Sequence, residues 1–179
     1  MVKVLFIPGK NSRTDDFLAM LRPNRRVFYL SAKSGNMVLT EDPELFVLEL
    51  PADRTPCDFG AQAVVIGAGG TRFSALPCGC VCDGAAAIFD PADAAACSFV
   101  RDSGWRPITC GLGEKNSISL SSVGEDRLVL SVGRDLTNLR GETLEVEERV
   151  FCAPVGDVGS AMLAGALLLL TEEERDEQQ

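Results

Sequence analysis

The chain has 179 residues, of which 46% are hydrophobic and 24% are charged, and its formal net charge is -9. This length suits one α/β domain with a sizeable buried core. The acidic balance opposes binding to nucleic acid or to an anionic membrane surface, and no basic patch stands out to overturn that expectation.

The apolar segments bear on where the protein works. The first apolar run, residues 2–7, is too short for a secretory signal, and no small-residue cleavage site follows it. The most apolar stretch, residues 161–170, falls short of the roughly 20 residues that span a bilayer. We therefore expect a cytoplasmic protein with a single domain over residues 1–171 and an acidic tail over residues 172–179.

The chain contains seven cysteines and no histidine. An odd number of cysteines without an export signal favours free thiols over a disulfide framework. Cys78, Cys80 and Cys82 have a C-x-C-x-C spacing, whereas zinc sites usually use C-x-x-C pairs. In a strand these thiols would lie on one face, so the cluster is either a metal site or a set of buried small side chains. The missing histidine excludes Ser-His-Asp and Cys-His catalysis.

The first half of the chain predicts alternating strands and helices. Residues 2–7 form a continuous apolar run, which is typical of a parallel strand covered on both faces. A helix is expected over residues 14–21, because Phe17, Leu18 and Leu21 fall on one side of it. Further strands are predicted over residues 26–30, 45–50 and 63–66.

The middle of the chain is less clearly patterned. Residues 67–70 lack the G-x-G-x-x-G spacing, so they indicate a strand-end loop, with a ligand loop as the alternative. Residues 81–82 and 86–89 are competing candidates for the next strand. Asp90 is then the expected N-cap of a helix that has Pro91 at its first position. A strand is expected over residues 106–110.

After Gly113 the hydrophobic period changes to two. This alternation predicts an antiparallel meander with one solvated face. A last helix, from about residue 157 to residue 170, is apolar almost all round and should be buried in the core or in an interface. The alternating positions are Ile118 and Leu120, then Leu128, Leu130 and Val132, then Leu144 and Val146.

Several strings, taken in order, resemble the central ATP-binding domain of the Mur ligases and folylpolyglutamate synthetases. That family opens with a strand, the motif T-G-T-N-G-K-T and a helix. Residues 8–14 here read P-G-K-N-S-R-T, so Gly9, Asn11 and Thr14 match, while Ser12 replaces a glycine and Arg13 replaces the lysine. The resemblance implies an α/β fold with a mostly parallel, three-layer sheet, the C-terminal meander and the final helix. It also implies a degenerate phosphate-binding loop made of Gly9, Asn11, Ser12, Arg13 and Thr14.

Other matching strings follow in the family's order. Residues 47–51 resemble the strand end that carries a magnesium-binding glutamate, a role that would fall on Glu49. Residues 90–93 and 108–113 resemble the family's N-A-D-D-P turn and its T-F-G-L strand, and residues 160–166 resemble a helix near the end of that domain. The flanking ligase domains have no counterpart in this sequence. Between Gly70 and Cys78 the chain is too short for the segment that carries the family's modified lysine.

The loop chemistry departs from a working phosphate site. Ser12 puts a side chain where glycine lets the backbone approach the phosphates, and the planar guanidinium of Arg13 cannot simply replace a compact ammonium. Asp15 and Asp16 place carboxylates in the first helical turn, where they stabilise the helix dipole by roughly 0.3–1 kcal/mol and repel a triphosphate. Thr14 is explained as a helix N-cap, although its hydroxyl could touch a metal.

Three functions remain open from the sequence. The first is a non-catalytic Mur-ligase-like domain that binds a protein partner or a small ligand, without ATP or magnesium. The second is an ATP-dependent carboxylate–amine ligase subunit that works with other chains, with ATP and Mg²⁺ as cofactors. The third is a homo-oligomer that uses the apolar last helix as its interface. Glu49 is either an ordinary strand-end carboxylate or a metal ligand, and Asp90 and Asp93 are expected to cap a helix rather than catalyse a reaction.

Overall fold

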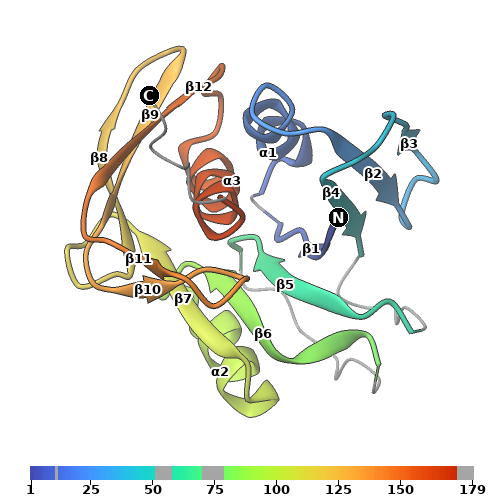
Figure 1. The fold of residues 1–179 in the computed structure, drawn as a ribbon, viewed down its shortest axis with the longest axis horizontal. Helices are drawn as coiled ribbons and strands as arrows, with labels where there is room; N and C mark the ends of the chain where they lie inside the picture. Colours follow the sequence, from blue (N-terminus) through green and yellow to red (C-terminus); the bar gives the residue numbers. More distant parts are fainter. Residues whose placement is uncertain (11, 51–57, 70–78, 173–179) are drawn as a thin grey trace.

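The computed structural model describes residues 1–10, 12–50, 58–69 and 79–172. Most of the described strands form one curved sheet, which has the spatial order β12-β9-β8-β7-β6-β5-β1-β4-β2-β3 (Figure 1). A separate two-stranded sheet pairs β10 with β11. The strand bounds are β1 Val2–Ile7, β2 Val27–Ser31, β3 Met37–Val38, β4 Leu45–Glu49, β5 Ala61–Ile66, β6 Val81–Phe89, β7 Arg106–Gly111, β8 Ile118–Val123, β9 Arg127–Val132, β10 Leu136–Thr137, β11 Thr143–Leu144 and β12 Glu148–Cys152.

The sheet is parallel from β2 through β4, β1, β5, β6 and β7 to β8. The pairs β2–β3, β8–β9 and β9–β12 are antiparallel. This topology confirms the predicted α/β fold with a mostly parallel sheet and a C-terminal antiparallel part. In such a sheet, the loops that follow the parallel strands gather at its carboxyl edge.

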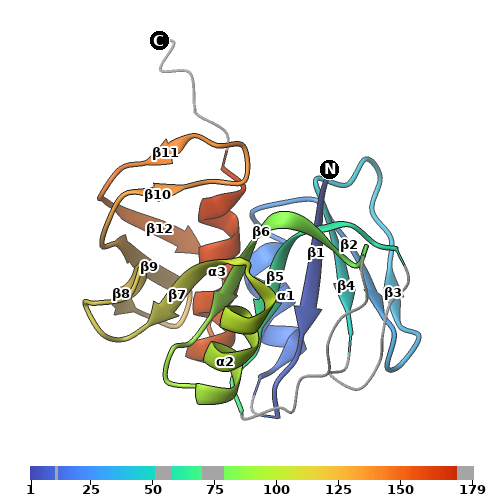
Figure 2. The ribbon, with the colours of Figure 1, turned by 90° about the horizontal axis from the view of Figure 1, so that it is seen from below.

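The helices cover both faces of the sheet, which makes three layers (Figure 2). Helices α1 (Thr14–Leu21) and α3 (Val158–Leu170) share one face, and α2 (Ala94–Ser103) lies on the other. Successive residues of β1 explain why two cores form. Val4 and Phe6 belong to the α1/α3 core, whereas Leu5 and Ile7 belong to the α2 core, because neighbouring side chains of a strand point to opposite faces.

Helix α3 lies in the concave side of the sheet, between α1 and the β8–β9–β12 strands (Figure 1). Every residue from Ser160 to Leu170 is buried, which confirms the prediction that the last helix belongs to the core. Its N-cap is Asp157, whose carboxylate accepts a hydrogen bond from the Ser160 N–H at 2.7 Å. Gly165 lets the helix approach β9 closely, since a Cβ there would lie 2.7 Å from the Leu130 side chain.

The start of α2 differs from the prediction. The N-cap is Asp93, not Asp90, and its Oδ1 accepts hydrogen bonds from the N–H groups of Ala95 and Ala96 at 3.0 and 3.2 Å. Asp90 instead closes the turn after β6 by accepting from the Ala92 N–H at 2.8 Å. Pro91 lies in that turn rather than in the helix. Two aspartates three residues apart offer the same capping chemistry, so sequence alone did not separate them.

Three strand predictions also need correction. The competing segments 81–82 and 86–89 belong to one strand, β6. Leu144 lies in the separate β10–β11 sheet and Val146 is an exposed loop residue, so the third strand of the meander is β12 instead. Strands β3 and β10 were not predicted, because each has only two residues and therefore shows no alternation. Among the described residues, none of the helices is long and apolar enough to cross a bilayer.

Candidate functional site

The connection that follows β1 packs tightly against the connection that follows β5. A Cβ on Gly9 would overlap the carbonyl oxygens of Gly67 and Ala68, and a Cβ on Gly67 would lie 2.7 Å from the Gly9 nitrogen. The Gly67 N–H also donates to the Ile7 carbonyl at 2.9 Å. Glycines at both positions therefore let two backbone segments meet at the carboxyl edge of the sheet. Residues 67–69 form the strand-end loop that the sequence predicts, and Gly70 lies outside the described residues.

Ser12 faces into this contact. Its Oγ donates to the Gly9 carbonyl at 3.0 Å, and its Cβ would lie 2.7 Å from a Cβ placed on Gly67. The side chain thus lies between the β1 connection and Gly67, within the turn that leads to α1. Of the predicted loop residues, Gly9, Ser12, Arg13 and Thr14 are brought together here, and Asn11 lies outside the described residues.

Arg13, rather than Thr14, is the N-cap residue of α1, which corrects the predicted capping role of Thr14. Arg13 provides no side-chain cap, and Thr14 is the first helical residue. The Arg13 N–H donates to the Oγ of Ser160 at 3.0 Å, so the start of α1 is bound to the start of α3. The helix begins one residue earlier than a threonine cap requires, and the acceptor for the N–H of its N-cap residue comes from α3.

The two aspartates of the first turn of α1 have different surroundings. Asp15 is exposed, whereas Asp16 is mostly buried, with 16% of its side chain accessible. The Oδ2 of Asp16 lies 3.0 Å from the Nε of Arg13, and the carboxylate packs against Gly156, where a Cβ would lie 2.9 Å from the Asp16 Cγ. The Arg13 guanidinium is therefore paired with a carboxylate three residues further along its own chain.

Glu49 ends β4 at the same carboxyl edge, in register with Phe6 on β1 and Ser31 on β2. It is buried, with 6% of its surface exposed, and the hydroxyl of Tyr29 donates a hydrogen bond to its Oε2. Burial raises the pKa of Tyr29 above its usual range, and the bond to Glu49 adds to the effect while a bond with Ser31 opposes it. The buried carboxylate thus has a neutral donor from the neighbouring strand.

Asp93 connects the loop that follows β5 to the start of α2 at this edge. While its Oδ1 caps α2, its Oδ2 accepts from the Gly69 N–H at 3.2 Å, which ties the β5 connection to the start of α2. Asp90 and Asp93 also line a shallow groove of about 460 Å³ beside Ala68 and Gly69. The capping role expected for Asp93 is confirmed.

The cysteine cluster is only partly described. Cys80 is buried just before β6, whereas Cys82 is exposed on β6, and Cys78 lies outside the described residues. In the part of the chain that the structure describes, no three His, Cys, Asp or Glu side chains are grouped to hold a metal ion.

Three residues of this edge were missed from the sequence: Tyr29, Gly67 as a partner of Gly9, and Ser160. Tyr29 carried a usable signal, since it is the only tyrosine of the chain and lies one residue before the end of the strand predicted over residues 26–30. Ser160 carried none, because its bond to Arg13 spans 147 positions of sequence.

No protein-family model matches the chain, and no curated protein matches it either. Solved structures do match its fold. One is E. coli FolC in complex with DHPP and ADP, with a TM-score of 0.53 and 13% identity over 97% of this chain and 54% of that one. Another is MurF from Acinetobacter baumannii, with a TM-score of 0.52 and 14% identity over 94% of this chain and 43% of that one.

Both similarities extend over nearly all of this chain, which spans only about half the length of these two proteins. At such low identity the likeness concerns the fold alone. The chain therefore folds as a Mur ligase-like domain.

Proposed function

We propose that this chain is a non-catalytic Mur-ligase-like domain that binds a partner and does not use ATP. The ion pair between Arg13 and Asp16 carries the proposal. A phosphate loop needs a cation free to reach the outer phosphates and backbone N–H groups facing an empty cradle. Here the cation at the lysine position is paired with the chain's own carboxylate.

The residues around the loop do not fit a triphosphate. Ser12 lies against Gly67 and Gly9, in the position where a glycine would leave room for the backbone to approach an anion. Asp15 and Asp16 add two carboxylates at the positive end of the helix dipole. Each would repel a phosphate charge by about 1 kcal/mol at ~4 Å in a water-like dielectric, and by more in a closed pocket.

Isothermal titration with Mg-ATP tests the proposal. We expect no measurable binding to the natural chain, and a gain of binding in a Ser12→Gly, Arg13→Lys, Asp16→Thr variant, because these changes restore the glycine and the compact cation and remove one carboxylate. Arg101→Lys, an exposed arginine on α2, is the matched control and should bind no better than the natural chain. Micromolar affinity of the natural chain for Mg-ATP would contradict the proposal.

A second candidate is an ATP-dependent carboxylate–amine ligase subunit that works with other chains. The close packing of Gly9 on Gly67 and Ala68 favours it, since the outline of the loop is kept, and Glu49 lies at the same edge as a possible magnesium ligand. ATP turnover in the presence of co-purifying chains, abolished by Arg13→Ala, would support this candidate. Absence of turnover with every such chain would remove it.

The third function weighed from the sequence, a homo-oligomer joined through the last helix, is weakened by the packing of α3. All residues from Ser160 to Leu170 are already buried within one chain. An oligomer would therefore have to use another surface.

A further inference from the structure

A basic groove lies at the end of the sheet opposite the candidate site. It has a volume of about 430 Å³ and is formed by the α1–β2 connection, the end of β3 and the residue before β4. The parallel strands β2 and β4 begin here, whereas the connections that follow β1, β5 and β6 lie at the other edge. Its lining residues include Arg22, Arg25, Arg26, Val38, Leu39 and Glu44.

Three of the chain's 17 basic residues fall within positions 22–26 and line this groove. Arg26 is paired with Asp42 at 3.3 Å and with Glu44 at 3.8 Å. Within the described residues, no carboxylate forms an ion pair with Arg22 or Arg25. The groove therefore brings together two guanidinium groups without ionic partners, beside Arg26, and the sequence alone did not single out this cluster because only three arginines are involved.

The backbone around these arginines is already satisfied. The N–H groups of Asn24 and Arg25 donate to the Leu21 carbonyl at 3.0 and 2.9 Å, and the Asn24 side chain donates to the Met20 carbonyl at 2.9 Å. These bonds occupy carbonyls at the end of α1 that arginine side chains commonly bind. The Arg25 guanidinium donates from its Nη1 to the Asn24 carbonyl at 3.0 Å, beyond the last residue of α1, so neither arginine is needed to cap the helix.

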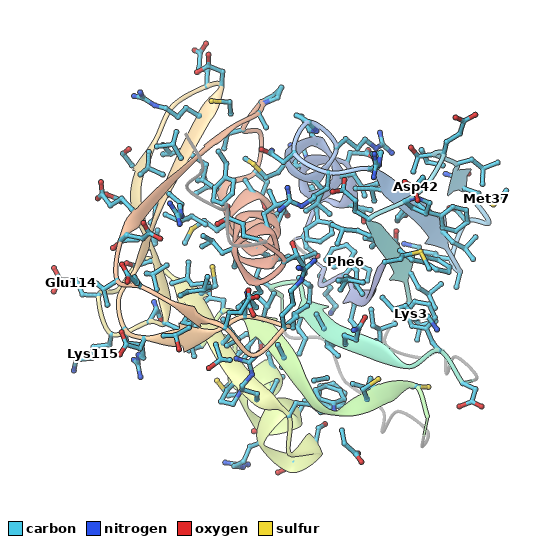
Figure 3. All side chains as sticks on the ribbon, in the orientation of Figure 1. Lys3, Phe6, Met37, Asp42, Glu114 and Lys115 are labelled. Atoms are coloured by element: carbon cyan, nitrogen blue, oxygen red, sulfur yellow. The ribbon has the colours of Figure 1, made fainter. Side chains whose placement is uncertain are left out.

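The other wall of the groove is apolar and lies at the open edge of the sheet. Val38 and Leu39 line the groove and are 36% and 68% exposed, Met37 beside them is 54% exposed, and β3 is the last strand of the sheet on this side. Met37 lies at the same end of the molecule as Asp42, beyond β2 (Figure 3). An edge strand offers backbone groups that can pair with an added strand, and its exposed side chains can contact alternate residues of that strand.

We propose that this groove binds an extended segment of a partner protein in which acidic and apolar residues alternate. Carboxylates of the segment pair with Arg22 and Arg25, its apolar side chains cover Val38 and Leu39, and its backbone extends the sheet beside β3. Charge complementarity selects an acidic ligand, since a basic or neutral segment leaves both arginines without a carboxylate partner. The inference rests on the proposed partner-binding role and names the surface that would bind the partner. It does not depend on whether the loop after β1 binds ATP.

A fluorescein-labelled peptide of alternating Glu and Val residues serves as the probe in fluorescence polarisation. We expect it to bind the natural chain and to bind an Arg22→Glu, Arg25→Glu variant at least about tenfold more weakly, because two attractive charge pairs become repulsive. Arg101→Glu, an equal charge reversal on α2, should leave the affinity unchanged. Leu39→Ser should weaken binding as well, and higher salt should weaken it further.

Four results would overturn the inference. They are no binding of the Glu-Val peptide, equal binding of a Lys-Val peptide, equal binding of a Glu-Ser peptide, and equal loss in the Arg101→Glu control. Tighter binding after deletion of residues 173–179 would reassign the groove to the chain's own acidic C-terminal residues. A dimer in light scattering that Arg22→Glu, Arg25→Glu abolishes would reassign it to a second copy. None of these outcomes depends on Mg-ATP, so they are distinct from failure of the proposed function.

Discussion

The two ends of the parallel sheet differ in how their polar groups are satisfied. At the carboxyl edge, Arg13 pairs with Asp16, Tyr29 donates to Glu49, and Asp93 binds both α2 and the β5 connection. At the opposite end, Arg22 and Arg25 have no carboxylate partner among the described residues. The carboxyl edge thus gains stability from contacts within the chain, whereas the opposite end keeps charges available to a ligand. The comparison teaches that, of these two ends, the basic side chains without a carboxylate partner among the described residues lie at the one away from the candidate site.

The largest expected effect comes from the backbone contact at the carboxyl edge. Gly67→Ala should lower the free energy of unfolding by about 3 kcal/mol, because the new Cβ meets the Gly9 nitrogen and the Ser12 side chain with no room to move. Gly124→Ala is the matched control, since its Cβ would lie 3.9 Å from the nearest atom. Chemical denaturation of both variants checks the prediction, and equal stabilities would show that the two connections are not in tight contact.

The second effect concerns the buried pair of Tyr29 and Glu49. Tyr29→Phe should cost about 1–3 kcal/mol, because it removes the donor from a buried carboxylate. Since the pKa of Tyr29 is raised in the folded state, the stability it provides is complete below the ordinary tyrosine pKa of about 10 and is lost as the pH rises beyond it. The natural chain should therefore lose stability above that pH faster than Tyr29→Phe does.

Tyr29 is the only tyrosine, so ultraviolet absorbance of tyrosinate reports its ionisation directly. Glu49→Gln should remove only part of the upward shift in the Tyr29 pKa, because burial is a larger cause of that shift than the bond to Glu49. A tyrosine that titrates normally in the folded chain would refute the buried pair.

A smaller effect is expected at the start of α2. Asp93→Ala should cost about 1–2 kcal/mol, because it removes the cap of the helix and the bond to the Gly69 N–H. Asp93→Asn keeps the acceptor oxygen and should cost much less. Thermal unfolding of the two variants distinguishes a capping role from a purely electrostatic one. If Asp93 acted only through its charge, both substitutions would lower the stability by the same amount.

The smallest effect is expected at the opposite end. Arg22→Ala and Arg25→Ala should each change the free energy of unfolding by less than about 0.5 kcal/mol, because neither guanidinium forms an ion pair among the described residues. A loss comparable to that of Asp93→Ala would show that these arginines stabilise the fold, and the contrast between the two ends would disappear.

Local patterns predicted most of the fold. The apolar runs of β1 and β4 and the helical spacing of Phe17, Leu18 and Leu21 depend only on neighbours in sequence, and these elements lie where they were expected. The order of short motifs also led to the fold family. Two-residue strands such as β3 and the choice between Asp90 and Asp93 could not be settled, because the deciding contacts are tertiary or equivalent in sequence.

The candidate site was less predictable for the same reason. The sequence singled out Ser12 and Arg13, but their partners come from distant segments or depend on side-chain orientation. Gly67 meets Ser12 across 55 positions of sequence, and Ser160 binds the Arg13 N–H across 147. The pairing of Arg13 with Asp16 is local, yet a guanidinium on a long flexible stem can reach many groups, and only the packing of Asp16 against Gly156 limits the choice.

The position of α3 has a consequence for how the chain is made. Among the described residues, α3 is the helix that covers β7 and β9 on the concave side of the sheet, so the apolar residues there stay in water until the segment up to Leu170 has left the ribosome. A nascent chain that ends before Val158 should therefore be sensitive to protease and prone to aggregation, and protection should appear abruptly once the last turns of α3 emerge. Emergence of α3 would thus decide when the earlier strands become stable.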